Sequence, residues 1–564
     1  MNGKKIFQAM RNIDPRLVLD AAPAQKSHTR YAWVKWGALA ACLCLIVGAV
    51  FLFMPDDPTP PTPPTPHTHA FGEWQTIKDA SCTVQGEEMR ACSCGEKESR
   101  FTAILPHFAG EWVVEKEPTI KLPTPEDPNE REPGLKAQFC ERCGAKLEEE
   151  IIPATGSLGL AYAMNADCKT FSVAGIGNCT DTEIIIPENF CGYHVTSIME
   201  GAFRDCDNIT SITLPETVSV IGKEAFLGCN ILLTVELFEG LVEIGDRAFA
   251  SCTTLENITI PSTVQKIGEG AFHACYRIKE IVIPNGVTVL EKDLFNGCWS
   301  LSKVTLPEGL LSIGEYALKE CAMQTIEIPK TVQSIGKYAF YECEKLRSID
   351  IPEGITVIEN DAFSYCTRLA IAKLPSSLTK IGYCSFQKSG LEQVVVPAGV
   401  ISIGDYAFEE CKNLQSVVLS EGLQSIGAFA FCDCIKLTSI QIPASIKRLG
   451  VHAFAGCEKL IQVKNGVHYV DKWMVKCENN VTEVVLREDT VGIADSACQV
   501  ANALKRITLP NGLKYIGEYA LYSGYTLEEI IYDGTRLEWE NVQKEDRWCL
   551  DPINLVFFAR RTEE

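Results

Sequence analysis

One repeated pattern of about 23 residues constrains this chain more than any other feature. "IPSTVQKIGEGAFHAC" occupies residues 260–275, and "IPKTVQSIGKYAFYEC" and "VPAGVISIGDYAFEEC" follow further along the chain. A fixed period in this range is typical of a solenoid, in which each coil contacts only its neighbours. The anchoring positions, spaced by 23 residues with two steps of 22, are Ile198, Ile221, Ile244, Ile267, Leu290, Ile313, Ile335, Ile358, Ile381, Ile403, Ile426 and Leu449, with weaker copies at Ile493 and Ile516.

Each part of the consensus L-x-x-I-x-I-P-x-x-V-x-x-I-G-x-x-A-F-x-x-C has a structural role. The alternating I-x-I predicts a short strand with two inward side chains and one outward side chain. Proline ends that strand because it has no N–H to donate, and Ile-Gly predicts a bend. A-F-x-x-C predicts a brief helical turn that brings phenylalanine and cysteine into the core. Because one coil cannot bury its own apolar face, we expect the phenylalanines of stacked coils to form a ladder.

The consensus resembles the bacterial leucine-rich repeat of the treponemal, BspA-like type, over roughly residues 159–540. The resemblance implies a leucine-rich-repeat solenoid with short parallel β-strands on its concave face and turns and short helical segments on its convex face. Residues 157–197 resemble the N-terminal cap of such arrays, residues 198–522 the solenoid itself and residues 523–564 the C-terminal cap. Residues 462–480 depart from the repeat and predict an inserted β-hairpin.

Cysteine recurs at one position of the repeat. Stacking would place neighbouring cysteines within reach of disulfide formation. The column has an odd number of members and Ser389 interrupts it, so we expect buried thiols in a small apolar position. The column consists of Cys206, Cys229, Cys252, Cys275, Cys298, Cys321, Cys343, Cys366, Cys411, Cys434 and Cys457.

The first 66 residues predict a membrane anchor and a stalk. Residues 36–54 carry no charge, and a helix of that length spans about 28 Å, the thickness of a hydrocarbon core. The preceding residues hold seven Lys/Arg and two Asp, which favours a cytoplasmic tail over residues 1–32, a single span over residues 33–54 and an extracellular remainder. A cleaved signal peptide is the alternative. Residues 55–66 contain seven prolines and predict an extended stalk.

Residues 67–153 contain two units that each open on His-x-x-Gly-Glu-Trp and end on a cysteine knuckle. Thiolates on such a turn are typical zinc ligands, which predicts a structural zinc site. The predicted ligands are Cys82, Cys92, Cys94 and His107, with Cys140 and Cys143 in the second knuckle. A Cys82–Cys92 disulfide or free thiols are the alternatives. The arrangement resembles His/Cys-knuckle spacer repeats on surface proteins of anaerobic Firmicutes, which implies a spacer role.

Charge and motif content argue against several classes of function. The net charge is -21, and the head is basic, so the rest of the chain is strongly acidic and is repelled by nucleic acid. The chain has no H-E-x-x-H, G-x-S-x-G or P-loop motif. The four histidines of the array, His194, His273, His452 and His468, are scattered. We therefore expect neither an enzyme nor a cofactor in the solenoid.

The outward side chains of the strands are the predicted binding surface. Among them, Ile371, Val395 and Val418 predict an exposed apolar patch that requires a partner or a cover. We expect a membrane-anchored adhesin or receptor for an extracellular protein or glycoconjugate; the family resemblance implies adhesion. The alternative is a signalling protein acting through residues 4–23 of the tail. No oligomeric state is indicated. The predicted ligand-binding residues are Lys303, Thr305, Glu327, Asp350, Ile371, Lys373, Gln393, Val395, Val418 and Gln441.

Overall fold

The structure is a computed structural model that describes residues 68–122, 131–523, 525–549 and 554–557. These residues fall into two compact units, residues 1–105 and 106–564. The predicted tail, membrane span and stalk lie outside the described residues. Within the described part, none of the helical structure is long and apolar enough to span a bilayer.

The first unit is a small antiparallel sheet with the strand order β1-β2-β3. Its strands are β1 (Gln75–Lys78), β2 (Glu87–Ala91) and β3 (Lys97–Phe101). Every residue of β1 and β3 is exposed, and Cys82 and Cys92 are the only buried apolar residues among the described residues of this unit. The unit therefore lacks a hydrophobic core of its own.

The second unit begins with a related sheet that continues into the solenoid. The sheet has the order β4-β7-β8 and consists of β4 (Ala109–Lys116), β7 (Gly134–Cys140) and β8 (Lys146–Ile152). Between β4 and β7, the short strands β5 (Thr119–Ile120) and β6 (Arg131–Glu132) pair with each other. Ile120 also pairs in parallel with Phe190 and is buried, so the inserted segment adds a strand to the start of the array.

The array opens with a mixed group of strands. The antiparallel pairs are β9 with β10 and β12 with β13, and β10 runs parallel to β13. Tyr162 and Phe190 stack with ring centroids 3.9 Å apart, so aromatic side chains close the end of the core. These strands are β9 (Ala161–Met164), β10 (Phe171–Gly175), β12 (Asn189–Phe190) and β13 (Tyr193–Ile198).

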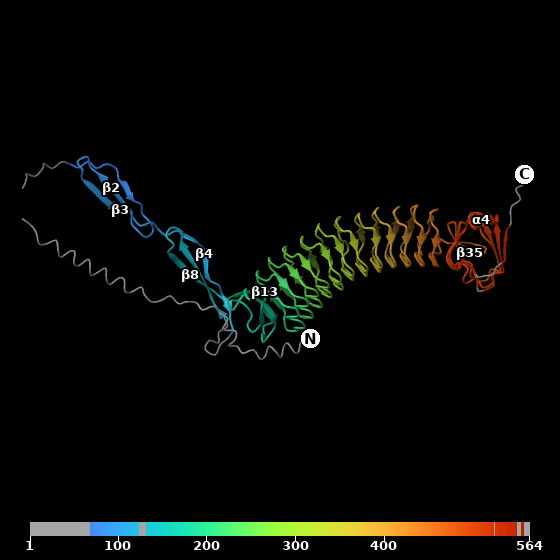
Figure 1. The fold of residues 1–564 in the computed structure, drawn as a ribbon, viewed down its shortest axis with the longest axis horizontal. Helices are drawn as coiled ribbons and strands as arrows, with labels where there is room; N and C mark the ends of the chain where they lie inside the picture. Colours follow the sequence, from blue (N-terminus) through green and yellow to red (C-terminus); the bar gives the residue numbers. More distant parts are fainter. Residues whose placement is uncertain (1–67, 123–130, 524, 550–553, 558–564) are drawn as a thin grey trace, which may run out of the picture. The chain divides into compact units, whose positions relative to one another are not determined.

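Figure 1 shows the coils that follow, stacked one beside the next from green to orange. Most of them contribute a strand from their I-x-I segment to a first ladder, which is interrupted after β18, β22 and β27. In β20, for example, Ile281 is buried and Val282 is exposed. Their outward side chains form what we term the strand face. The strands of this ladder are β11 (Glu183–Ile185), β14 (Ser211–Thr213), β16 (Thr234–Glu236), β18 (Asn257–Ile258), β20 (Glu280–Val282), β22 (Lys303–Thr305), β25 (Ser348–Asp350), β27 (Ile371–Lys373), β29 (Gln393–Val395) and β31 (Ser416–Val418).

A second parallel ladder forms at the Ile-Gly position of each coil. Its strands after β13 are β15 (Val220–Ile221), β17 (Glu243–Ile244), β19 (Lys266–Ile267), β21 (Val289–Leu290), β23 (Ser312–Ile313), β24 (Ser334–Ile335), β26 (Val357–Ile358), β28 (Lys380–Ile381), β30 (Ser402–Ile403), β32 (Ser425–Ile426) and β33 (Arg448–Leu449). This ladder is interrupted between β19 and β21 and again between β24 and β26.

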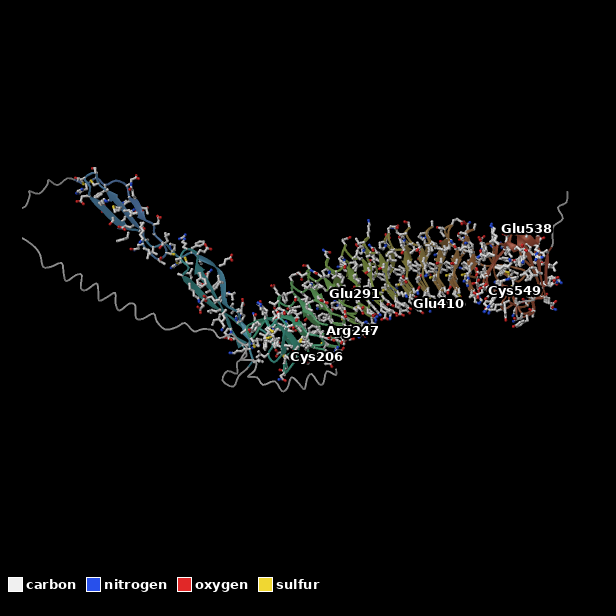
Figure 2. The ribbon with its side chains drawn as sticks, viewed as in Figure 1. Cys206, Arg247, Glu291, Glu410, Glu538 and Cys549 are labelled. Carbon is white, nitrogen blue, oxygen red and sulfur yellow. The ribbon has the colours of Figure 1, made fainter. Side chains whose placement is uncertain are left out.

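The glycine that follows isoleucine in most coils explains where neighbouring strands of this second ladder pair with each other. A Cβ atom on Gly268 would lie 2.5 Å from the backbone N of Asp246 and 2.7 Å from the carbonyl carbon of Gly245. The coils that follow the two interruptions carry Glu291 (Figure 2) and Glu359 in place of this glycine. We attribute the interruptions to the added Cβ, which requires the backbone of the neighbouring coil to stand further away.

The A-F-x-x-C segments are turns rather than the short helical segments expected there. In one coil Arg247 (Figure 2) and Ser251 have φ angles of 53° and 59°. Left-handed residues cannot continue an α-helix. Their backbone N–H groups instead donate to the next coil, to the carbonyls of Glu269 and His273 at 2.8 and 2.7 Å. The turns therefore join neighbouring coils through a further set of backbone hydrogen bonds.

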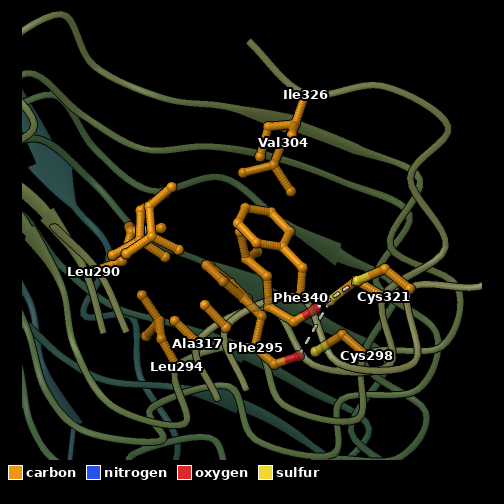
Figure 3. Packing of buried hydrophobic residues seen from close by; sticks show 14 of the residues in the cluster. Leu290, Leu294, Phe295, Cys298, Val304, Ala317, Cys321, Ile326 and Phe340 are labelled. Carbon is orange, nitrogen blue, oxygen red and sulfur yellow. Dashed lines mark hydrogen bonds between the residues drawn. The ribbon is translucent and has the colours of Figure 1, made fainter. Parts of the chain in front are cut away.

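The phenylalanines form the predicted ladder inside the coils. Neighbouring rings have centroids 5.1 to 5.6 Å apart and lie within 11° of parallel. Leu318 takes the position between Phe295 and Phe340, and both rings are fully buried (Figure 3). The members are Phe203, Phe226, Phe249, Phe272, Phe295, Phe340, Phe363, Phe386, Phe408, Phe431 and Phe454.

The cysteine column is buried from Cys229 onward, and its members are thiols in this structure. The thiols lie beside the phenylalanine ladder (Figure 3) and donate to a carbonyl of the preceding coil at 3.0 to 3.4 Å. Burial raises the pKa of the Cys298 thiol to about 12, so the proton needed for this bond is retained. Cysteine therefore supplies a hydrogen bond as well as apolar volume.

An antiparallel group interrupts the repeat before the last coils. It comprises β34 (Gln462–Lys464), β35 (Val467–Val470) and β36 (Trp473–Cys477). The array then continues with β37 (Glu483–Val485), β38 (Gly492–Ile493), β39 (Arg506–Pro510), β40 (Tyr515–Ile516), β41 (Glu529–Asp533), β42 (Gln543–Lys544) and β43 (Asn554–Phe557). The one α-helix of the described residues, α4 (Arg536–Glu540), begins with a capping box between Thr535 and Glu538 and buries Trp539 against the final coil.

Candidate binding surface and metal-ligand clusters

All ten residues predicted to bind a ligand have exposed side chains on the strand face. They lie on β22, β25, β27, β29 and β31, with Glu327 and Gln441 at equivalent positions of coils that form no strand there. The structure does not gather them into one site. Nine of them lie at an apolar patch or line one of two polar recesses, and Gln441 lies at neither.

The apolar patch is formed by Ile371, Val395 and Val418, which are 58%, 61% and 55% exposed. Val395 and Val418 are register partners in the parallel pair of β29 and β31. Ile371 lies on β27 of the preceding coil. The neighbouring Gln393 is also exposed and gives the patch a polar edge.

The larger polar recess has a volume of about 870 Å³ and is lined by Lys303, Thr305 and Glu327. It lies where the first ladder is interrupted after β22. One residue fewer separates Cys321 from Ile326 than separates the corresponding residues of the coil before. This shorter connection coincides with the loss of strand pairing, so a deletion visible in the sequence marks a recess in the surface.

A second recess of about 480 Å³ adjoins the first and is lined by Glu327, Asp350 and Lys373. Lys373 Nζ lies 2.9 Å from Asp350 Oδ2, and both side chains are more than two thirds exposed. Ion pairs this exposed contribute little to stability. Their charges are therefore available to a polar partner.

A third recess was not foreseen from the sequence, where its histidines look scattered. It has a volume of about 460 Å³, and His452, Glu458, His468 and Lys476 line it together with apolar side chains. Burial lowers the pKa of His452, and the nearby Lys476 lowers it further. The inserted strands β35 and β36 bring His468 and Lys476 to the coil that holds His452, so this site depends on the insertion.

We term the two cysteine-knuckle repeats of residues 67–153 the first and second knuckle modules. In the first module, the cysteines lie with a different histidine from the one predicted. Cys92 and Cys94 lie with His69, not with the predicted partner His107, and the three potential ligand atoms are within 4.8 Å of one another. His69 Nδ1 is 3.2 Å from Cys94 Sγ. Cys82 is buried in the turn that the Ser81 N–H closes on the Val84 carbonyl. The sequence signal for this histidine is the opening His-x-x-Gly-Glu-Trp motif, which contains His69 but was not used to predict a ligand.

In the second module, His107 lies with Cys140 and Cys143. His107 Nδ1 is 3.5 Å from Cys143 Sγ. Where the first module has Cys82, the second has Thr119 and Ile120, and Ile120 pairs with Phe190 at the start of the array. The predicted set of four is thus not gathered at one place: Cys92 and Cys94 lie with His69, and His107 lies with Cys140 and Cys143.

Both knuckles stabilise thiolate, the form of cysteine that binds metals. Hydrogen bonds, first from the backbone and side chain of Cys94 and then from His69, lower the pKa of Cys92 to about 6. At Cys140 burial raises the pKa, but hydrogen bonds from His107 and from backbone N–H groups outweigh it and lower the pKa to about 5.

The repeated coils match a known protein family. Residues 176–299, 289–415, 379–501 and 470–540 match the family described as BspA type Leucine rich repeat region. The chain belongs to this family. The match, which spans more than half of the chain, and the stacked coils together confirm the predicted fold class, a leucine-rich-repeat solenoid of the BspA-like type.

The solved structures that resemble this chain include bacterial leucine-rich-repeat proteins. One from Bacteroides ovatus is 24% identical, with a TM-score of 0.48 over 71% of this chain and 98% of that chain. A leucine rich cell surface protein from Faecalibacterium prausnitzii is 26% identical, with a TM-score of 0.41 over 70% and 98%. The pneumococcal vaccine antigen PcpA is 19% identical, with a TM-score of 0.34 over 72% and 94%. The comparison with curated proteins gives no match.

Proposed function

We propose that this chain is a membrane-anchored extracellular binding protein, an adhesin or surface receptor, that recognises a protein or glycoconjugate through its strand face. Binding rather than catalysis is the proposed activity. The proposal is supported by family membership, by a strand face that the solenoid leaves open along its length, and by the uncharged segment of residues 36–54 behind a basic head.

The observation that carries the proposal is the apolar patch of Ile371, Val395 and Val418. Each side chain is more than half exposed on a strand face whose neighbouring positions are mostly polar. Exposed apolar groups beside polar edges are typical of the centre and rim of a protein interface. A protein partner therefore fits the patch, and the adjoining polar recesses with Lys303, Glu327 and Asp350 suit hydroxyl or charged groups of the same ligand.

The test is a binding screen of the chain against extracellular matrix proteins and glycans, followed by the double substitution Val395→Glu with Val418→Glu. Two carboxylates in the patch should abolish binding and leave the circular dichroism spectrum unchanged, because neither side chain enters the core. Val282→Glu with Val485→Glu is the matched control, since these valines are 61% and 69% exposed on equivalent strands elsewhere. Equal loss in both double variants, or undiminished binding in the first, would contradict a role for the patch.

The proposed membrane location has a separate test. Full-length protein should fractionate with membranes and keep its N-terminus, and protease added outside the cell should digest the chain beyond residue 55. A mature chain that begins after residue 54 would show that the apolar segment is a cleaved signal peptide.

The alternative proposal, signalling through the cytoplasmic tail, rests on the basic sequence at residues 4–23. A pulldown with residues 1–30 as bait tests it. A specific cytoplasmic partner would support signalling, whereas its absence would leave the tail as a retention segment.

A further inference from the structure

We propose that each knuckle module binds one zinc ion, through His69, Cys92 and Cys94 in the first module and through His107, Cys140 and Cys143 in the second. This goes beyond the proposed binding function and does not depend on it. The ligand type decides the metal, because thiolate with imidazole is the donor set of zinc, whereas magnesium and calcium take oxygen ligands.

The distances between donor atoms fit a shared ion. With typical bond lengths to zinc, a tetrahedral site holds its nitrogen and sulfur donors about 3.5 Å apart. His69 Nδ1 lies 3.2 Å from Cys94 Sγ, and His107 Nδ1 lies 3.5 Å from Cys143 Sγ. All donor atoms of each set are within 4.8 Å of one another. The donor set of the first module has three members, which leaves a fourth position for water or another side chain.

The two knuckles have the same backbone design although their cysteine spacings differ. Gly95 N–H donates to the Cys92 carbonyl at 2.9 Å, and Gly144 N–H donates to the Cys140 carbonyl at 2.8 Å. Both glycines are left-handed, with φ angles of 95° and 71°. The turn therefore presents both thiols of each knuckle toward the histidine, and the missing residue between Cys92 and Cys94 does not disrupt it.

The first module also needs a cross-link. Its sheet buries no large apolar side chain among the described residues, and Phe101 is 71% exposed. Units this small usually depend on a metal or on disulfides when they lack a core. Among the described residues of this module the buried apolar side chains are those of Cys82 and Cys92, and Cys92 is one of the proposed metal ligands.

The decisive measurement is the zinc content of the full chain, purified without chelator and measured by elemental analysis. The expected content is two zinc ions per chain. His69→Ala with Cys94→Ser should reduce it to one, and so should His107→Ala with Cys143→Ser. Cys343→Ala is the matched control, because this thiol is buried in the solenoid, and it should leave the content at two.

Cobalt substitution keeps the test decisive if a variant module fails to fold. Cobalt added to metal-free, reduced chain should give thiolate-to-cobalt charge-transfer absorption, and each double variant should lose half of it. Absence of both zinc and this absorption would overturn the proposal. So would a disulfide joining Cys92 to Cys94 and another joining Cys140 to Cys143 in the freshly isolated protein. Val395→Glu with Val418→Glu should retain both ions, which separates this result from the outcome of the binding test.

Discussion

The solenoid and the first knuckle module solve the same problem in different ways. Both are built from short units that cannot bury an apolar face alone. In the solenoid, neighbouring coils share one continuous core, and rings such as Phe363 and Phe386 stack at 5.3 Å. In the module, apolar side chains such as Phe101 remain exposed, and the buried apolar side chains among its described residues are those of cysteines. Repetition supplies the core in the solenoid, and we propose that a metal cross-link takes its place in the module.

The largest effect should come from breaking the shared core at Phe340, which is fully buried and stacks on Phe363 at 5.2 Å. Phe340→Ala should lower the free energy of unfolding by about 3–5 kcal/mol, because it opens a cavity. Chemical denaturation followed by circular dichroism measures this. Phe101→Ala in the first module is the comparison and should change stability by about 0.5 kcal/mol or less. Equal effects would contradict the contrast between the two regions.

The next effect tests the close approach of neighbouring coils at the Ile-Gly position. A Cβ on Gly404 would lie 2.7 Å from the carbonyl carbon of Gly382 and 2.8 Å from the N of Tyr383. Gly404→Ala should therefore destabilise the chain by about 1–3 kcal/mol through overpacking.

Gly309 provides the matched control for that substitution. A Cβ there would meet no atom within 4 Å, so Gly309→Ala should change the free energy of unfolding by about 0.5 kcal/mol or less. If the two alanine variants were equally stable, the explanation for the interrupted second ladder would be wrong.

The smallest effect concerns the cysteine column. The Cys343 thiol donates to the Leu318 carbonyl at 3.1 Å, so Cys343→Ala should cost about 1 kcal/mol for the lost bond. A serine hydroxyl would be unpaired in a purely apolar position, but here it can donate a hydrogen bond to the same carbonyl. Cys343→Ser should therefore cost no more than Cys343→Ala in the same denaturation experiment. A clearly larger cost for serine would show that the position is purely apolar.

The solenoid could be predicted from the sequence because the residues that specify each coil lie close together in the chain and recur in every copy. Isoleucine, phenylalanine and cysteine return at fixed intervals, and each copy restates the same burial pattern. The turns could not be predicted in the same way. Arg247 and Ser251 adopt left-handed φ angles, yet their residue types give no signal for it, and only the hydrogen bonds to the next coil reveal why the backbone takes that conformation.

The candidate sites were predicted less completely because they depend on contacts between distant segments. The outward positions of Val395 and Val418 follow from strand alternation, so the patch could be predicted. His69 lies 23 residues before Cys92, and only the folded sheet brings its ring to the knuckle. Ile120 likewise gave no sign that it would pair with Phe190 at the start of the array.

One measurement tests the contrast between stacking and cross-linking most directly: backbone hydrogen exchange of the full chain, read by mass spectrometry before and after a zinc chelator is added. We expect the chelator to remove protection from the knuckle amides of Gly95 and Gly144 and from their sheets, while amides of the solenoid such as Phe249 and Phe340 stay protected. Unchanged exchange in both modules, or equal loss of protection in the solenoid, would contradict it.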